Sequence, residues 1–259
     1  MKTTIQNLLK FANSFADVSR DILKKKFFQQ FKIQEKKDGS FVTNIDIEIE
    51  LKFREKLKKT FPSHSVLGEE FGLEARGDDF IWIIDPLDGT HNFIAGKPIF
   101  GTLISCLENN QPILGLIDIP ILNQRWCGGY KKGVKFNGKK CPLIAPQKKY
   151  KELIVSSTSI LMFENKDEEV IRGIYKQIGF PVFGGDCYSY GLLLSGKIDQ
   201  IIEAKMKPWD YMAQVSLINE QGGVITDWNG NELGIESEGK VIASVEKKHH
   251  KRTLRFLNK

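Results

Sequence analysis

Between residues 99 and 140 the chain repeats one pattern, in which short β-prone segments alternate with turn residues. Four segments share a high content of β-branched, aromatic and other apolar residues: IFGTLISCLE (99–108), PILGLIDIP (112–120), QRWCGGY (124–130) and GVKFNGKK (133–140). Asn109-Asn110 and Asn137-Gly138 lie at breaks in this pattern, and such pairs are typical of tight hairpin turns. The pattern predicts an antiparallel meander, preceded by two short strands at 64–72 and 80–85.

Two amphipathic helices precede these strands. Apolar residues recur at helical intervals through the first thirty residues, and the helix ends in an aromatic cluster at Phe27, Phe28 and Phe31. The segment KKDGS (36–40) then breaks it. A second helix fits residues 44–60, where apolar residues recur every four positions.

After Pro146 strands and helices alternate. Strands are predicted at 152–157, 181–186, 199–204, 222–227 and 241–245. Helices are predicted at 164–178, just after Asp186, from Pro208, and at the C-terminal end. The expected fold is therefore α+β, with an antiparallel N-terminal sheet and a mixed C-terminal α/β half. Because no linker or repeat separates the parts, we expect two packed subdomains, 1–145 and 146–259, with the site in the cleft between them.

The charge pattern bears on possible partners. The net charge is +6, and the segment KKHHKR (247–252) is basic. Nucleic-acid binding would need a contiguous basic face, whereas these lysines are spread through the chain and a terminal charge run is typical of a solvated helix face. A basic nucleic-acid-binding protein is therefore only a remote alternative, and no nucleic-acid partner is expected.

The cysteines and the apolar segments bear on compartment. Four cysteines are scattered without a CxxC pair or zinc-ligand spacing, so buried free thiols are expected: Cys106, Cys127, Cys141 and Cys187. No apolar segment approaches the roughly 20 residues needed to cross a bilayer, and the first residues are amphipathic rather than a signal core. We expect a cytoplasmic protein with no membrane partner.

The segment IIDPLDGT (83–90) places two carboxylates three residues apart after an apolar run. If Pro86 takes the second position of a tight turn, Asp85 folds back toward Asp88 and both reach one hard cation. The amides at Gly89 and Thr90 then face an anion. The alternative is an ordinary Asp-Pro-x-Asp-Gly loop.

Three other acidic positions have structural alternatives of their own. The acids of GEE (68–70) follow a predicted strand and suit a solvent-exposed strand end. Asp46 lies three residues after Thr43, which is the spacing of a capping box. Asp210 follows Pro208 in a predicted first helical turn, where an acid complements the helix dipole.

Taken together, these motifs are more specific than any one of them. VTNID (42–46), LGEE (67–70), DPLDGT (85–90) and PWD (208–210), in this order, resemble the inositol monophosphatase superfamily of magnesium-dependent phosphatases. The resemblance runs from about Lys37 to Asp227. It implies a layered α-β-α-β-α sandwich, a homodimer and a small-molecule phosphate ester as substrate.

The resemblance also implies a ligand set for two to three Mg²⁺ ions. Glu69, Asp85 and the Leu87 carbonyl hold the first ion. Asp85 bridges to a second ion, which Asp88 and Asp210 also hold. Clustered divalent ions suit the reaction because they supply a nucleophile and neutralise phosphoryl oxygens.

The implied mechanism is in-line attack by a water molecule that Glu69 and the Thr90 hydroxyl activate. Asp46 stands behind them and, with Glu69, orients a third, weaker ion. The phosphate rests on the amides of Gly89 and Thr90, between Asp88 and Asp210.

For the substrate, GGDCYSYG (184–191) resembles the histidinol-phosphate phosphatase branch. The alcohol part of histidinol phosphate carries an ammonium group and a titratable imidazole, and Asp186 with Glu203 offers it two acids as charge-assisted partners. The alternative for Asp186 is an N-cap of a helix opening at Cys187. An inositol-1-phosphate phosphatase or a broad sugar-phosphate phosphatase remains the alternative activity, and Asn92 is more typical of the inositol enzymes.

Nearby side chains have alternative roles as well. His91 is a candidate phosphate contact or a surface residue. Three aromatic residues are candidates for stacking on an imidazole, although their spacing is more typical of core residues: Tyr188, Tyr190 and Trp209.

Overall fold

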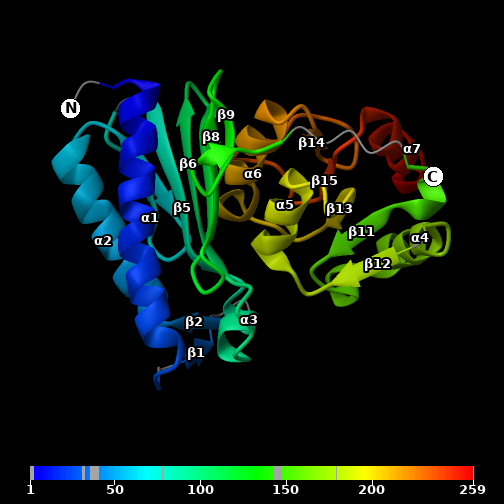
Figure 1. The fold of residues 1–259 in the computed structure, drawn as a ribbon, viewed down its shortest axis with the longest axis horizontal. Helices are drawn as coiled ribbons and strands as arrows, with labels where there is room; N and C mark the ends of the chain where they lie inside the picture. Colours follow the sequence, from blue (N-terminus) through cyan, green and yellow to red (C-terminus); the bar gives the residue numbers. More distant parts are fainter. Residues whose placement is uncertain are drawn as a thin grey trace.

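The computed structural model describes residues 3–30, 33–35, 41–77, 79–142, 148–178 and 180–258. Phe31 and the predicted break at 36–40 lie outside these residues. The described chain is layered as helices, sheet, helices, sheet and helices (Figure 1). This arrangement confirms the predicted α-β-α-β-α sandwich.

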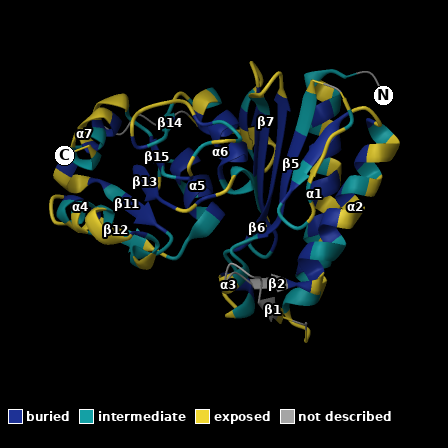
Figure 2. Cartoon of the chain, turned by 180° about the vertical axis from the view of Figure 1, so that it is seen from behind, coloured by how far each residue is buried: buried dark blue, intermediate teal, exposed yellow. Residues whose placement is uncertain are grey.

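The first layer consists of α1 (Ile5–Phe27) and α2 (Asn44–Thr60). Thr4 caps α1 by accepting a hydrogen bond from the amide of Asn7, and Thr43 caps α2. Both helices turn an apolar stripe toward the first sheet and an exposed stripe outward (Figure 2). The predicted bounds of α2 are confirmed.

The first sheet has the strand order β10-β9-β8-β7-β6-β5-β3-β4. Its strands are β3 (Ser65–Gly68), β4 (Gly72–Glu74), β5 (Phe80–Asp88), β6 (Gly101–Glu108), β7 (Gln111–Ile119), β8 (Gln124–Gly129), β9 (Gly133–Phe136) and β10 (Lys139–Lys140). The antiparallel meander from β6 to β10 is confirmed, and the turn residues Asn109, Asn110 and Asn137 have positive φ angles.

One pairing in this sheet departs from the antiparallel expectation, because β3 pairs with β5 in parallel. The strand β4 folds back along the outer side of β3, and the chain then crosses to place β5 on the other side of β3. Strand spacing along the sequence carries no signal for this crossover.

The second sheet has the order β12-β11-β13-β15-β14 and mixed pairing, as predicted for this half. Its strands are β11 (Ile154–Ser157), β12 (Phe180–Phe183), β13 (Gln200–Glu203), β14 (Val224–Thr226) and β15 (Val241–Ser244). Between the sheets lie α5 (Asp186–Leu194) and α6 (Pro208–Glu220), and on the outer face lie α4 (Asn165–Tyr175) and α7 (Lys247–Leu257).

Short elements complete the description. A small sheet of β1 (Ile33–Glu35) and β2 (Phe41–Thr43) lies near α3 (Thr90–Ile94), and 3-10 turns form at Tyr150–Glu152 and Ile160–Met162. The buried core of the described chain runs through every interface between layers.

All four cysteines are free and buried, as predicted. None of the described helices is both long and apolar enough to cross a membrane.

Candidate active site

The predicted tight turn at Pro86 is wrong, because β5 continues through Asp88 rather than ending at residue 85. Asp85 pairs with Leu103 and Asp88 pairs with Gly101, so two residues of β5 face one residue of β6 in a β-bulge. Residues three apart in a regular strand point to opposite faces. The bulge removes this difference and lets both carboxylates face the same point.

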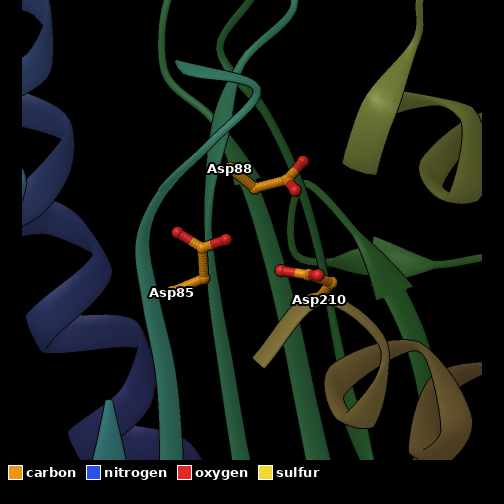
Figure 3. A group of neighbouring side chains, drawn as sticks. All are labelled: Asp85, Asp88 and Asp210. Carbon is orange, nitrogen blue, oxygen red and sulfur yellow. The ribbon is translucent and has the colours of Figure 1, made fainter. Parts of the chain in front are cut away.

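Asp210, in the first turn of α6, completes a group of three carboxylates with Asp85 and Asp88. One carboxylate oxygen of each residue lies within 4.8 Å of those of the other two. The three side chains lie close together where β5 meets α6 (Figure 3). Asp210 also caps its own helix, because its Oδ2 accepts a hydrogen bond of 2.7 Å from the amide of Lys207. The predicted position in the first helical turn and the predicted clustering are therefore both present in one side chain.

Burial and mutual repulsion favour the protonated, neutral form of these three carboxyl groups. Burial, followed by the charges of Glu69, Asp88 and Asp210, raises the pKa of Asp85 well above its usual range. Burial and then the charge of Asp186 raise the pKa of Asp88 to about 7. Burial and then Asp88 raise the pKa of Asp210 in the same way. Such a group is suited to a hard divalent cation, which prefers oxygen ligands and relieves the repulsion.

Glu69 and Asp46 flank this group. Glu69 lies in the turn after β3, its amide donates to the Ile84 carbonyl at 3.3 Å, and its side chain hydrogen-bonds to Asp85. Asp46 forms the predicted capping box, accepting a hydrogen bond of 2.9 Å from the Thr43 amide and one from the Thr43 hydroxyl. Burial raises the pKa of Asp46 to about 6, and the charge of Glu69 adds to the effect. Glu69 therefore connects Asp46 with the aspartate group.

The backbone after the bulge is held by its own side chains. The amide of Leu87 donates to Asp85 Oδ1 at 2.9 Å, and the Thr90 hydroxyl donates to the Leu87 carbonyl at 2.9 Å. Gly89 precedes α3 with a φ of 80°, a conformation that favours glycine. Hydrogen bonds within the segment from Asp85 to Thr90 therefore fix its backbone conformation.

A cavity of about 140 Å³ adjoins the aspartate group. Its lining comes from the bulge and from the C-terminal half: Asp88, Thr158, Met162, Asp186, Cys187, Tyr190, Glu203, Ala204, Lys205, Met206 and Asp210. The predicted substrate residues Asp186 and Glu203 therefore share one wall beside two of the three clustered aspartates.

The N-cap role that was the alternative for Asp186 is not observed. The helix α5 begins at Asp186 itself, and its N-cap is Gly185. The carboxylate that meets the first turn of α5 belongs to Asp88, whose Oδ2 accepts from the Cys187 amide at 2.7 Å. Asp186 instead accepts a hydrogen bond from the Asn92 side chain. Burial raises the pKa of Asp186.

Glu203 is held by Thr158, a residue that the sequence did not single out. Glu203 Oε1 accepts hydrogen bonds from the Thr158 amide at 2.9 Å and from its hydroxyl at 2.8 Å. The Thr158 side chain also hydrogen-bonds to Asp186. Burial and then the charges of Asp186 and Asp88 raise the pKa of Glu203 to about 8. Thr158 follows β11, which lies beside β13 only in the folded sheet, so no local signal marks it.

The nearby residues are mainly structural. Tyr190 is buried and donates to the Met206 sulfur, while Tyr188 and Trp209 pack against the same core, which favours the core interpretation for all three. His91 is exposed at α3.

Comparisons with known proteins identify relatives that are phosphatases. The sequence profile of the inositol monophosphatase family matches residues 4–259. The bifunctional phosphatase IMPL2, chloroplastic, of Arabidopsis thaliana is 37% identical over 249 residues, covering 93% of this chain and 70% of that protein. A histidinol-phosphatase of Chlorobaculum parvum is 28% identical over 94% of this chain and 93% of its own length.

The fold has relatives among solved structures as well. An inositol monophosphatase from Zymomonas mobilis superposes with a TM-score of 0.89 and 31% sequence identity, over the whole of both chains. The profile match across nearly the full sequence and this similarity lead to one conclusion: the chain belongs to the inositol monophosphatase family and is a phosphatase.

Proposed function

We propose that this phosphatase hydrolyses L-histidinol phosphate and that it uses Mg²⁺. The main support is the group of Asp85, Asp88 and Asp210, each of which has one oxygen within 4.8 Å of the others. This group lies beside a cavity whose wall holds two further acids, Asp186 and Glu203. The first group suits a cation and its phosphate, and the second suits a cationic alcohol.

The described residues fit magnesium in donor chemistry. The ligands would be Glu69, Asp85, the Leu87 carbonyl, Asp88 and Asp210, which offer oxygen atoms only. Burial and mutual repulsion make it unfavourable for these carboxyl groups to ionise together, which is why their pKa values are raised. A bound cation offsets this cost. When bound, Mg²⁺ supplies charge neutralisation for the phosphoryl oxygens and lowers the pKa of water.

The chain's own residues supply the remaining functions. Glu69, between Asp85 and Asp46, takes a proton from the attacking water. Asp46, with its pKa near 6, stabilises the charge change at Glu69. The Thr90 hydroxyl already donates to the Leu87 carbonyl, so its oxygen is free to accept from the water. The amides of Gly89 and Thr90 orient the phosphate at the start of α3.

The substrate assignment rests on the wall formed by Asp186 and Glu203. L-Histidinol carries an ammonium group and an imidazole that titrates near neutral pH, and each forms a charge-assisted hydrogen bond with a carboxylate. A bound cation would also relieve the raised pKa values of the two acids. The histidinol-phosphatase from Chlorobaculum parvum supports this assignment. The alternative is an inositol-1-phosphate phosphatase or a broad sugar-phosphate phosphatase, which the Zymomonas mobilis structure supports.

The experiment that tests the substrate assignment is Asp186→Ala with Asp186→Asn as its matched variant. Both remove the charge, and Asn retains an oxygen that can accept from Asn92. The kcat/KM for histidinol phosphate should fall about tenfold more than that for inositol 1-phosphate in both variants. Equal losses on the two esters would contradict the role of Asp186 in selectivity.

Three further properties belong to the proposal. We propose a homodimer, a cytoplasmic location, and a division into subdomains at 1–145 and 146–259. These remain predictions, which sedimentation, localisation and limited proteolysis test.

A further inference from the structure

In the bulge of β5 the backbone carbonyl of Pro86 has a side chain of the neighbouring strand as its partner. Thr102 of β6 lies opposite the bulge, between Gly101 and Leu103, which pair with Asp88 and Asp85. Its hydroxyl donates to the Pro86 carbonyl at 2.9 Å, and the side chain is fully buried. A side chain thus replaces the backbone donor that a regular strand pairing would provide.

A second buried hydroxyl, that of Ser19, contacts Thr102. Ser19 of α1 is fully buried, and its hydroxyl hydrogen-bonds to that of Thr102. A hydroxyl has one proton to donate, and Thr102 donates its proton to Pro86. Ser19 is therefore the donor to Thr102, and the chain of hydrogen bonds runs from α1 through β6 to the bulge.

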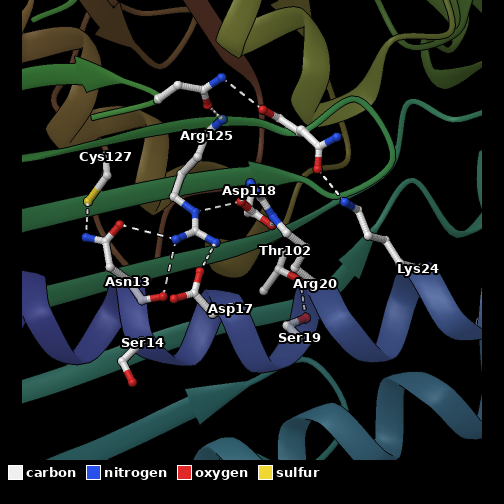
Figure 4. A network of polar contacts seen from close by, with 12 residues as sticks. Asn13, Ser14, Asp17, Ser19, Arg20, Lys24, Thr102, Asp118, Arg125 and Cys127 are labelled. Atoms are coloured by element: carbon white, nitrogen blue, oxygen red, sulfur yellow. Dashed lines mark hydrogen bonds and ion pairs between the residues drawn. The ribbon is translucent and has the colours of Figure 1, made fainter. Parts of the chain in front are cut away.

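The helix that carries Ser19 is fixed at this place by charged side chains (Figure 4). Asp118 of β7 is the register partner of Thr102 and is 1% exposed. Its carboxylate accepts from Arg20 Nε at 3.0 Å and from Arg125 Nε at 2.6 Å. Because Arg20 follows Ser19 directly, these contacts hold the Ser19 hydroxyl above Thr102.

We propose that Thr102 and Ser19 are positioning residues for the metal site. They fix the bulge, and the bulge keeps Asp85 and Asp88 on one face of β5. This inference rests on the proposed function, since it concerns how the proposed magnesium ligands are held. Neither residue lines the cavity beside the aspartates.

The informative variant is Thr102→Val. Valine has nearly the shape of threonine and suits a strand, but it cannot donate to Pro86. The buried carbonyl then lacks its partner, and the bulge can relax toward other geometries. The two aspartates lose their fixed separation, although no magnesium ligand has been changed.

Two variants serve as controls. Thr102→Ser keeps the hydroxyl and should rescue the site. Ser105→Ala, on the same strand, also removes a buried donor, because the Ser105 hydroxyl donates to the Leu114 carbonyl at 2.9 Å, with the Met212 carbonyl as a more distant alternative acceptor at 3.3 Å. Those acceptors do not belong to the bulge. Ser105→Ala therefore reports the general effect of losing a buried hydrogen bond on β6.

The test is isothermal titration of Mg²⁺ into each metal-free protein, with melting temperatures recorded in parallel. We expect Thr102→Val to weaken Mg²⁺ binding about tenfold or more, and Thr102→Ser and Ser105→Ala to stay within about twofold of the wild type. Unchanged binding in Thr102→Val, or an equal loss in Ser105→Ala, would overturn the positioning role.

If Thr102→Val does not fold, Ser19→Ala takes its place, because it removes only the outer donor and is expected to weaken binding about threefold. Unchanged binding in Ser19→Ala would then overturn the inference. A wild-type protein that binds no Mg²⁺ would overturn the proposed function itself, which is a different outcome from wild-type binding that the variants leave unchanged.

Discussion

The carboxylate of Asp88 accepts a hydrogen bond from the backbone amide of Cys187, 2.7 Å away. One residue of the first sheet thereby contacts the first turn of α5, a helix that lies between the two sheets, and it does so from within the aspartate group. The same side chain links β5 to α5 and contributes to the proposed metal site.

Asp88→Asn separates these two roles. Asparagine keeps an oxygen that can accept from the Cys187 amide, but it removes a charge from the proposed metal site. We expect phosphatase activity to fall at least about a hundredfold, while the melting temperature of the metal-free protein is retained or rises. Phosphate release and thermal unfolding measure the two effects.

Asp88→Ala is the matched control, because it also leaves the buried Cys187 amide without an acceptor. It should be about 1–3 kcal/mol less stable than Asp88→Asn. If Asp88→Asn retains most of its activity, Asp88 is not a metal ligand.

The metal-free protein should lose stability as pH rises from 6.5 to 8. The folded-state pKa values of Asp88 and Glu203 are about 7 and 8, above the value near ~4 of an unfolded carboxyl group. The folded protein therefore holds protons that the unfolded chain has released, and stability declines until these groups ionise. Each retained proton contributes about 1.4 kcal/mol per pH unit, so the melting temperature should fall by at least about 5 °C.

Two comparisons make this prediction specific. Burial lowers the pKa of His250 to about 4, so its contribution rises with pH mainly below about 6.5 and by only about 0.4 kcal/mol in the chosen window. Saturating Mg²⁺ should reduce the decline, since it favours the ionised form of the proposed ligand Asp88, and the share that comes from Glu203 should remain. An identical decline with and without Mg²⁺ would show that the carboxylates do not bind the cation.

The turn that carries Glu69 should depend on Glu50, a buried residue of α2. The Glu50 carboxylate accepts from the amide of Glu70 at 2.8 Å and pairs with Arg54 Nη2 at 2.7 Å. A Cβ at Gly68 would lie 2.1 Å from Glu50 Oε1. Gly68→Ala must therefore displace the carboxylate that anchors the turn, without any change in charge.

We expect Gly68→Ala to lower stability by about 1–3 kcal/mol and to weaken Mg²⁺ binding about tenfold. Gly173→Ala in α4 is the matched control, since among the described residues no heavy atom other than those of its chain neighbours and its own helix backbone lies within 4 Å of its Cβ position. Titration calorimetry and thermal unfolding give both quantities. If Gly68→Ala binds Mg²⁺ with the same affinity as Gly173→Ala, the Glu50 contact does not position Glu69.

Much of the fold follows from local patterns. Apolar spacing and the Thr43 capping box locate α2 to the residue, and Asn-rich turns locate the meander. The motifs also indicate that Asp85, Asp88 and Asp210 meet. These features depend on residues that are neighbours in sequence or on a pattern of several motifs together.

The parts that could not be predicted depend on partners distant in sequence. The bulge in β5 is defined by its pairing with Gly101 and Leu103, and its carbonyl by Thr102, so Asp85 and Asp88 meet through a strand irregularity rather than a turn. Likewise Thr158 contacts Glu203 only because β11 and β13 lie side by side.

Phosphate release from a panel of esters with Mg²⁺ present tests the central claim most directly. The panel is histidinol phosphate, inositol 1-phosphate, fructose bisphosphate and phosphoadenosine phosphate, each also measured with the metal chelated. We predict the highest kcat/KM for histidinol phosphate and no turnover without Mg²⁺. A higher kcat/KM for inositol 1-phosphate would contradict the substrate assignment, and hydrolysis that persists after chelation would contradict the magnesium site.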